Sequence, residues 1–305
     1  MTAPVAPRLV PVAVVVVLAA GCGGPAAPGP RRAGPPAGPP AVTSWVYQLQ
    51  GYAGGRLDAI ARGPHQLAVI DLARDAHADW FTPAEIARLR RAGKRVLAYF
   101  EIGSIESYRP EAAAVAGAGL ALNRWADWPE EHFVRYWDER WWSLAVRPRL
   151  DRALAAGYDG AYLDTPLAYE EIDLGLVPGR DRAGLARAMS ELVGRISRYA
   201  KQRRPGFWIV PQNSPELRHQ PGYLAAIDGI GMEELFYLAT DRPCVADFCA
   251  ENLAETRALR AAGKLVLAVD YVTGPARVHA CSRYRSEGFA GYPADRDLDR
   301  ISPPC

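Results

Sequence analysis

The chain has 305 residues, of which 49% are hydrophobic and 23% are charged, with a formal net charge of +2. This is enough apolar sequence for a large core, and a single β/α barrel typically uses about 250 residues. Three arginines and no acidic residue lie before Thr43, which leaves 33 basic against 34 acidic residues in the remainder. A domain with nearly equal numbers of acidic and basic residues is not a general binder of nucleic acid or other polyanions, because that function needs an excess of positive charge.

The first 21 residues have the pattern of a signal peptide. Arg8 precedes an apolar run that ends in Leu-Ala-Ala-Gly-Cys22, and this run is too short to span a bilayer. The ending resembles the bacterial lipobox, in which the cysteine is acylated and becomes the mature N-terminus, so Cys22 is the expected lipid anchor. The alternative is an ordinary secretory signal cleaved nearby. Residues 22–42 are rich in Gly, Pro and Ala and are expected to form a tether, which leaves residues 43–305 as the folded domain.

Eight apolar runs bounded by turn residues are candidate strands. They cover residues 45–49, 67–72, 95–102, 160–163, 207–211, 229–232, 265–269 and 288–292. Helices are expected between them. Thr82-Pro83-Ala-Glu85 has an N-cap, a proline at the first helical position and a capping-box glutamate, and Gly93 ends that helix.

The order of these elements predicts an α/β fold. Ala-Gly93-Lys-Arg-Val, before the third expected strand, recurs as Ala-Gly263-Lys-Leu-Val before the seventh. Alternating strands and helices predict a parallel sheet, and eight such units predict one closed TIM-type (β/α)8 barrel. A doubly wound open sheet is the competing architecture, but no Gly-x-Gly-x-x-Gly follows the first expected strand.

The third and fourth expected strands are separated by a segment rich in tryptophan. It contains Trp125, Trp128, Trp137, Trp141 and Trp142, five of the eight tryptophans of the chain. Aromatic rings here either stack on sugar rings or form the core of a long excursion. Both interpretations stay open.

Acidic residues follow several strands, at the ends where a β/α barrel carries its active site. The fourth strand leads to Asp164 and the sixth to Glu233 and Glu234, and two carboxyl groups facing one cleft are the minimal equipment for hydrolysing a glycosidic bond. Adjacent strand residues point to opposite faces, so only one of the two glutamates can face the cleft. Further candidates for binding the sugar or tuning the pair are Asp71, Glu101, Glu106, Tyr108, Arg109, Gln212, Asn213, Glu234, Asp270 and Tyr271. Arg109 is alternatively structural, pairing with a neighbouring acid.

Four cysteines remain after Cys22, an even number in an exported chain, where disulfides persist. Three pairings are possible. We favour Cys244 with Cys249, as a short clasp, and Cys281 with Cys305, which would tie the C-terminal tail to the last barrel unit. No Cys or His spacing matches a metal site, and hydrolysis by two carboxylates needs no metal or other cofactor. We expect a monomer.

The ordered succession of short motifs is similar to glycoside hydrolase family 114. The motifs are Tyr99-Phe-x-x-Gly103, Glu106-x-Tyr108-Arg109, Leu-Asp164-Thr, Pro211-Gln-Asn213, Glu233-x-Leu-Phe-Tyr237, Val-Asp270-Tyr271 and Gly288-Phe-x-x-Tyr292. The resemblance extends over residues 43–300 and implies a β/α barrel that acts as an endo-α-1,4-polygalactosaminidase on galactosamine-containing exopolysaccharide. It implies Asp164 as nucleophile or general base and Glu233 as general acid, and it selects Glu233 over Glu234.

Two positions depart from the family pattern. Ser104 stands where many relatives carry Glu, and Thr165-Pro166 follows Asp164 where combinations with Asn or Asp are common. Both positions flank the expected cleft, so they bear on the choice of substrate. An acidic pocket suits a polymer with protonated amines, because an ammonium beside a carboxylate gains charge-assisted hydrogen bonds, although a glycosidase for a neutral sugar would be acidic too.

A hypothesis from another functional class is a non-catalytic carbohydrate-binding barrel at the cell surface. It predicts that sugar binding survives replacement of Asp164 and that no product forms. Hydrolysis of a glycan-linked peptide or lipid headgroup is a weaker option, because the chain has no Gly-x-Ser-x-Gly nucleophile elbow.

Overall fold

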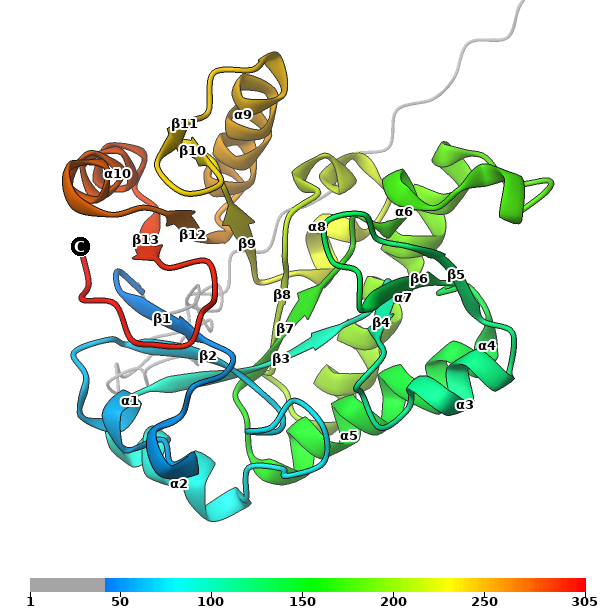
Figure 1. Cartoon of the computed structure of the whole chain (residues 1–305), viewed down its shortest axis with the longest axis horizontal. Helices are drawn as coiled ribbons and strands as arrows, with labels where there is room; N and C mark the ends of the chain where they lie inside the picture. Colours follow the sequence, from blue (N-terminus) through cyan, green and yellow to red (C-terminus); the bar gives the residue numbers. More distant parts are fainter. Residues whose placement is uncertain (1–41) are drawn as a thin grey trace, which may run out of the picture. The chain divides into compact units, whose positions relative to one another are not determined.

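The computed structural model describes residues 42–305, so the expected signal peptide, Cys22 and the tether before Val42 lie outside the described residues. Parallel strands form the centre of the described part (Figure 1). They are β1 (Trp45–Gln48), β2 (Leu67–Asp71), β3 (Arg95–Glu101), β7 (Gly160–Asp164), β8 (Trp208–Pro211), β9 (Gly229–Glu233), β12 (Leu265–Tyr271) and β13 (Ala290–Ala294). Each overlaps one of the eight predicted runs, and the prediction of a TIM-type barrel is confirmed.

The strands follow one another around the barrel in chain order. β1, β2, β3, β7 and β8 form one parallel sheet, and β9, β12 and β13 form a second. The two sheets meet after β8, where the Asn213 N–H donates to the Gly231 carbonyl at 2.7 Å. At the other seam, the Trp45 indole N–H donates to the Ala290 carbonyl at 2.9 Å, which joins β1 to β13. Because the strands are parallel, their carboxyl ends gather at one end of the barrel.

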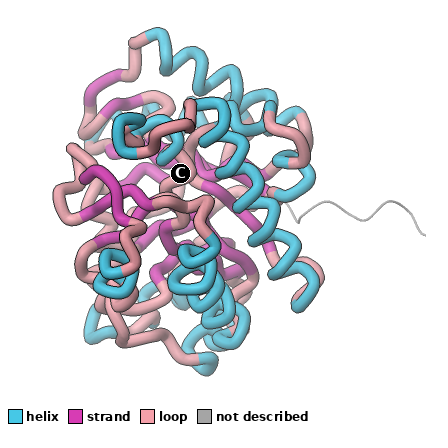
Figure 2. The backbone as a smooth tube through the Cα atoms, turned by 90° about the vertical axis from the view of Figure 1, so that its right-hand side faces the viewer, coloured by secondary structure: helices cyan, strands magenta, loops and turns pink. Residues whose placement is uncertain are grey.

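Helices cover the outside of the strands (Figures 1 and 2). They are α1 (Asp58–Arg62), α2 (Pro83–Arg91), α3 (Ala112–Gly117), α4 (Glu139–Trp141), α5 (Arg147–Ala156), α6 (Ala168–Glu171), α7 (Arg182–Arg203), α8 (Tyr223–Ala226), α9 (Asp247–Ala261) and α10 (Gly274–Glu287). The predicted capping box of α2 is present, since Thr82 and Glu85 each accept a hydrogen bond from the other's backbone N–H. Gly93 and Gly263 follow α2 and α9 with φ of 82° and 81°, the left-handed region that favours glycine. No helix among residues 42–305 is both long and apolar enough to cross a membrane.

Aromatic side chains fill the barrel beneath its carboxyl end. Trp45 and Tyr47 of β1 stack with ring centroids 5.5 Å apart, and Tyr47 packs on Tyr162 of β7 at 5.3 Å. Gly231 of β9 makes room for this layer, because a Cβ at that position would overlap the Tyr162 hydroxyl. Residues at the ends of the strands therefore rest on a packed floor.

A small antiparallel sheet follows β3. Its strands are β4 (Ser104–Glu106), β5 (Ala121–Arg124) and β6 (Glu131–Val134), in the order β4-β6-β5. A second short ribbon, β10 (Tyr237–Leu238) with β11 (Arg242–Pro243), follows β9. Neither was expected from the sequence.

Two disulfides close loops in the last third of the chain. They join Cys244 to Cys249 and Cys281 to Cys305, the two pairings favoured from the sequence. The first joins the residue that follows β11 to the first turn of α9, and the second ties the C-terminal residue to α10.

Candidate active site

A cavity lies at the carboxyl ends of the barrel strands. Its lining includes Tyr47, Asp71, Tyr99, Glu106, Tyr108, Arg109, Trp125, Trp128, Glu131, Asp164, Gln212, Asn213, Glu233, Tyr271 and Arg296. Asp164 is the last residue of β7 and Glu233 is the last residue of β9, so only β8 separates their strands. The structure thus brings the two predicted catalytic acids into one cavity.

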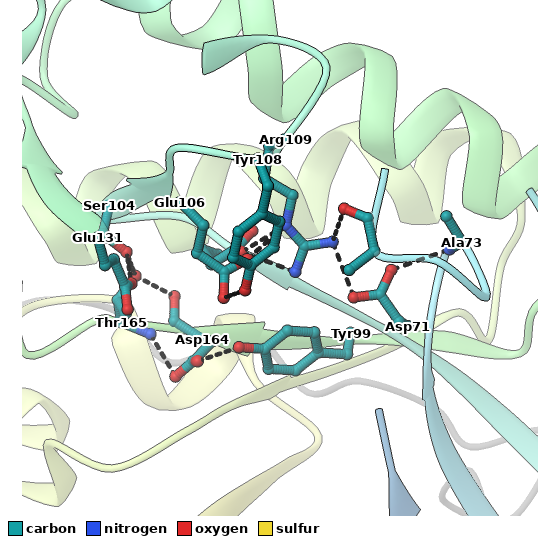
Figure 3. Close-up of polar contacts among 12 residues, drawn as sticks. Asp71, Ala73, Tyr99, Ser104, Glu106, Tyr108, Arg109, Glu131, Asp164 and Thr165 are labelled. Atoms are coloured by element: carbon teal, nitrogen blue, oxygen red, sulfur yellow. Dashed lines mark hydrogen bonds and ion pairs between the residues drawn. The ribbon is translucent and has the colours of Figure 1, made fainter. Parts of the chain in front are cut away.

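The Asp164 carboxylate is held by two donors (Figure 3). The Tyr99 hydroxyl donates to Oδ2 at 2.5 Å, and the Thr165 backbone N–H donates to Oδ1 at 2.7 Å. Burial and the charge of Glu233 raise the pKa of Asp164 to about 7, although both hydrogen bonds oppose the rise. Asp164 is therefore close to half ionised at neutral pH.

Glu233 is held by side chains from two neighbouring strand ends. The Tyr271 hydroxyl donates to Oε1, and the Asn213 amide donates to Oε2 at 3.2 Å. The Asn213 side-chain oxygen Oδ1 accepts a hydrogen bond from the Glu233 backbone N–H at 3.0 Å, which fixes the orientation of the side-chain amide. Burial raises the pKa of Glu233, while hydrogen bonds from Tyr271, Asn213 and Gln212 limit the increase. Both carboxyl groups at this end of the barrel thus have raised pKa values, and such a shift is what allows a carboxyl group to act as an acid near neutral pH.

Arg109 binds three of the acids predicted to bind the sugar or tune the pair, and Figure 3 labels two of them, Asp71 and Glu106. Its guanidinium lies 2.8 Å from Asp71, 2.8 Å from Glu101 and 2.5 Å from Glu106, which matches the structural alternative for this residue. Burial and the Glu101 charge raise the pKa of Glu106 well above its usual value, and the Tyr108 hydroxyl also contacts it. Within residues 42–305, no group of three or more His, Cys, Asp or Glu side chains is arranged to hold a metal ion.

Glu101 and Asp270 do not line the cavity, so of the two expected roles, binding the sugar or tuning the pair, only tuning is open to them. The charge of Glu101 does contribute to the raised pKa of Asp164. Glu101 is fully buried beneath Arg109 and also pairs with Arg149 at 2.9 Å. Burial alone would raise its pKa, but the two arginines lower it to about 2. Asp270 precedes Tyr271, which lines the cavity, so its side chain points to the opposite face of β12. There its carboxylate accepts hydrogen bonds from the Tyr284 hydroxyl at 2.7 Å and from the backbone N–H groups of Phe236 and Tyr237.

Glu233 and Glu234, at the end of β9, differ in whether their side chains line the cavity. Glu233 lines the cavity, whereas Glu234 lines an adjoining groove and accepts from the Ala239 N–H at 2.8 Å. The other predicted site residues that reach the cavity are Asp71, Glu106, Tyr108, Arg109, Gln212, Asn213 and Tyr271.

Glu131 of β6 is a cavity residue that the sequence analysis missed. It is 6% exposed, and the Ser104 hydroxyl contacts its carboxyl group. Burial and the charge of Asp164 raise the pKa of Glu131 to about 8, so it remains protonated at neutral pH. Its position in the tryptophan-rich excursion was the available signal, but no strand was predicted there.

The tryptophans of the excursion divide between the cavity and the core. Trp125 and Trp128 line the cavity, and the Arg296 guanidinium lies 5.3 Å from the Trp128 ring centroid. Trp141 and Trp142 are buried in the core, and Trp137 is partly buried against it; none of these three lines the cavity. The sugar-stacking interpretation is therefore available to the first two only, and Trp128, at 46% exposed, presents the larger free surface.

Comparison with known proteins adds independent information. The model of glycoside-hydrolase family GH114 matches residues 26–305. A protein of Deinococcus radiodurans without an assigned function is 34% identical, over 95% of this chain and 98% of its own length. The glycoside hydrolase domain of PelA from Pseudomonas aeruginosa superposes with a TM-score of 0.65 at 20% identity, covering 85% of this chain and 97% of that domain. Aspergillus fumigatus Ega3 in complex with galactosamine gives 0.68 at 19% identity, covering 90% and 100%. At these identities the two structures demonstrate a shared fold.

Proposed function

Because the chain belongs to glycoside-hydrolase family GH114, we propose that it cleaves α-1,4-linked galactosamine-containing polysaccharide with Asp164 and Glu233 as its catalytic pair. Family membership makes it a glycoside hydrolase. The observation that carries the proposal is that these carboxyl groups line one cavity and both have raised pKa values. Glycoside hydrolysis needs one protonated and one ionised carboxyl at neutral pH, and the raised pKa values of both groups support this pair for the two roles.

Glu233 is the proposed general acid, and Asp164 is the nucleophile or general base. Glu233 lines both the cavity and the adjoining groove, whereas Asp164 lines the cavity alone. A glycosidic oxygen joins two sugars, so an acid at the border of two binding spaces is placed to protonate it. Both carboxyl groups have raised pKa values, so the assignment of acid and base rests on their positions and not on their pKa values.

The reaction then follows from these positions. Glu233 gives its proton to the glycosidic oxygen as the bond to the anomeric carbon breaks. Asp164 either attacks that carbon directly or takes a proton from the water that attacks it. In both cases water is added across the glycosidic bond. The leaving sugar gains a hydroxyl group at the former glycosidic oxygen, and the other sugar becomes a new reducing end.

The acidity of the cavity supports an amine-bearing sugar. Asp71, Glu106, Glu131, Asp164 and Glu233 all line it, while the charge of Arg109 is already taken up by acids. Glu131 is protonated at neutral pH, and Asp71 and Glu106 pair with Arg109, so Asp164 and Glu233 are the acids left to offset a positive charge. A protonated amine beside an ionised carboxyl group of this pair gains charge-assisted hydrogen bonds. That Ega3, a protein of the same fold, was solved with galactosamine agrees with this choice.

The proposed location of the enzyme is outside the cytoplasm, where a lipid anchors it to the membrane. Residues 1–21 serve as a lipoprotein signal, Cys22 carries the lipid, residues 22–42 are the tether, and residues 43–305 are the catalytic domain; the Leu-Ala-Ala-Gly-Cys22 pattern supports this. Labelled palmitate should enter the native protein in cells and not Cys22→Ser. Equal labelling of both would contradict the anchor.

The catalytic proposal is tested by release of reducing ends from partly deacetylated galactosamine polysaccharide. Asp164→Asn and Glu233→Gln keep the volume of each side chain and remove its acid. Product from the native protein should fall by at least about 100-fold in both variants, the size of loss that general acid-base catalysis predicts. A folded native protein that binds the polymer without cleaving it would contradict the proposal and favour a carbohydrate-binding barrel.

A further inference from the structure

A second groove adjoins the cavity on the side of Glu233. Its walls come from the loop before β6, from α6, from the turn after β8, from the end of β9 and from α9, and they include Trp128, Glu170, Ser214, Glu216, Glu234 and Phe248. Glu233 and Trp128 line both the cavity and the groove. A chain of sugars in the cavity can therefore continue into the groove past the proposed general acid.

Ser214 presents an unpaired hydroxyl in this groove. It is 6% exposed, and its Oγ forms no hydrogen bond within residues 42–305. Leaving a buried hydroxyl unsatisfied costs about 1–3 kcal/mol, so such groups generally have a partner. Ser214 lines the groove, but its Oγ has almost no accessible surface, so the side chain must rotate toward the groove before a bound molecule can supply that partner.

Two groove carboxyls share one donor. The Tyr169 hydroxyl contacts Glu170 at 2.6 Å and also contacts Glu216. A phenol has a single proton and can donate to only one acceptor, so the second carboxyl lacks a donor whenever both are ionised. The basic residues nearest in sequence, at positions 218 and 219, pair with Glu255 instead.

The groove also carries apolar surface suited to a sugar ring. Trp128 is 46% exposed and Phe248 is 49% exposed. The groove lining contains one basic residue, Arg296, and five acidic residues, at positions 127, 170, 216, 233 and 234. Aromatic faces beside excess carboxylate suit a ligand with an apolar ring face and a positive charge.

We propose that this groove is a binding subsite for a protonated amino sugar on the leaving-group side of the scissile bond. Glu216 and Glu170 receive the ammonium, the Ser214 hydroxyl bonds a ring hydroxyl, and Trp128 or Phe248 packs on the ring. The inference rests on the proposed function and extends it, because Glu233 then lies between two bound sugars. The bond that is cleaved accordingly has an amino sugar on each side, as it has inside a polymer.

Glu216→Gln and Ser214→Ala test the subsite with two substrates. One is a galactosamine oligosaccharide, and the other is a nitrophenyl α-galactosaminide, whose leaving group has no amine. Relative to the nitrophenyl substrate, kcat/KM for the oligosaccharide should fall by about tenfold or more in E216Q, the loss expected for a hydrogen bond to a charged group, and by about threefold in S214A. Glu251→Gln removes an exposed charge from α9 outside the groove and should leave the ratio unchanged.

The outcomes separate this inference from the proposed function. Equal effects of E216Q and S214A on both substrates would overturn the subsite while leaving catalysis intact. S214A stays informative if E216Q fails to fold, because this hydroxyl has no partner within the described residues to lose. If the native protein cleaves neither substrate, the proposed function fails, and calorimetry with the same oligosaccharide decides the subsite: about tenfold weaker binding by E216Q supports it, and unchanged binding overturns it.

Discussion

Replacement of Tyr99 by Phe should shift the pH dependence of catalysis upward. The Tyr99 hydroxyl donates to Asp164 Oδ2 at 2.5 Å and so favours the ionised carboxylate. Burial and the charge of Glu233 nevertheless raise the pKa of Asp164 to about 7. A hydrogen bond to a charged group contributes about 1.5–3 kcal/mol, and one pKa unit corresponds to about 1.4 kcal/mol. Without the hydroxyl, the pKa of Asp164 should rise by a further one to two units, roughly.

The activity loss follows from the ionised fraction of Asp164. As nucleophile or general base, Asp164 acts only when ionised. With a pKa of about 7, half of it is ionised at pH 7, whereas a pKa of about 8 to 9 leaves about 1 to 10%. The kcat/KM of Y99F at pH 7 should therefore fall by about 5- to 50-fold and recover at higher pH. A profile of kcat/KM from about pH 5 to about pH 10 measures the shift.

Tyr136→Phe is the matched control. Tyr136 is also buried, but its hydroxyl donates to the Leu185 backbone carbonyl at 2.8 Å, and it does not line the cavity. Y136F should keep the native profile. An acid limb of Y99F that coincides with the native limb would refute Asp164 as the group that must ionise, as would a loss of rate that is uniform across pH.

Three further predictions concern stability and are measured by urea unfolding. Burial raises the pKa of Glu131 in the folded protein to about 8, from an ordinary value of 4.5. The free energy of unfolding of the native protein should therefore fall as the pH rises from about 4.5 to about 8, and Glu131→Gln should lack this contribution. A difference in unfolding free energy between the two proteins that stays constant from pH 5 to pH 8 would contradict this. Arg109→Met leaves buried acids unpaired and should cost about 3–5 kcal/mol, while Arg195→Met, which removes an exposed pair with Glu139, should cost at most about 1 kcal/mol; equal losses would refute the distinction. Cys281→Ser with Cys305→Ser opens a link between residues 24 apart and should cost about 3 kcal/mol, against about 2 kcal/mol for the pair 5 apart at Cys244 and Cys249; the reverse order would count against the chain-entropy explanation.

The barrel could be predicted because its strands are buried on both faces. β2 reads Leu-Ala-Val-Ile-Asp and is buried at every position, and continuous apolar runs of this kind are typical of parallel sheets. The sheet β4-β6-β5 escaped prediction for the opposite reason. β4 has three residues, and β5 reads Ala-Leu-Asn-Arg with no fully buried position, so neither has an apolar pattern to detect.

The site was predictable where chain direction alone decides the position of a side chain. Asp164 and Glu233 reach the cavity because they end parallel strands. Glu101 ends β3 in register with Asp164, yet it is withdrawn from the cavity. The cause is its pairing with Arg109 and Arg149, which lie 8 and 48 residues further along the chain. No local pattern connects these arginines to Glu101, so its burial could not be inferred from the sequence.

The small sheet also explains how the cavity has a carboxyl group at the edge where Ser104 lies. β4 pairs antiparallel with β6 so that Ser104 is opposite Phe133, and Glu131, two residues earlier, lies on the same face of β6. The Ser104 hydroxyl contacts Glu131 and lies 2.8 Å from the Thr165 hydroxyl, whose backbone N–H donates to Asp164. A carboxyl group therefore stands beside the Asp164 segment although residue 104 is a serine, because a neighbouring strand supplies it. Whether a carboxyl group lies at this edge of the cavity depends on how β6 is paired, and it cannot be judged from residue 104 alone.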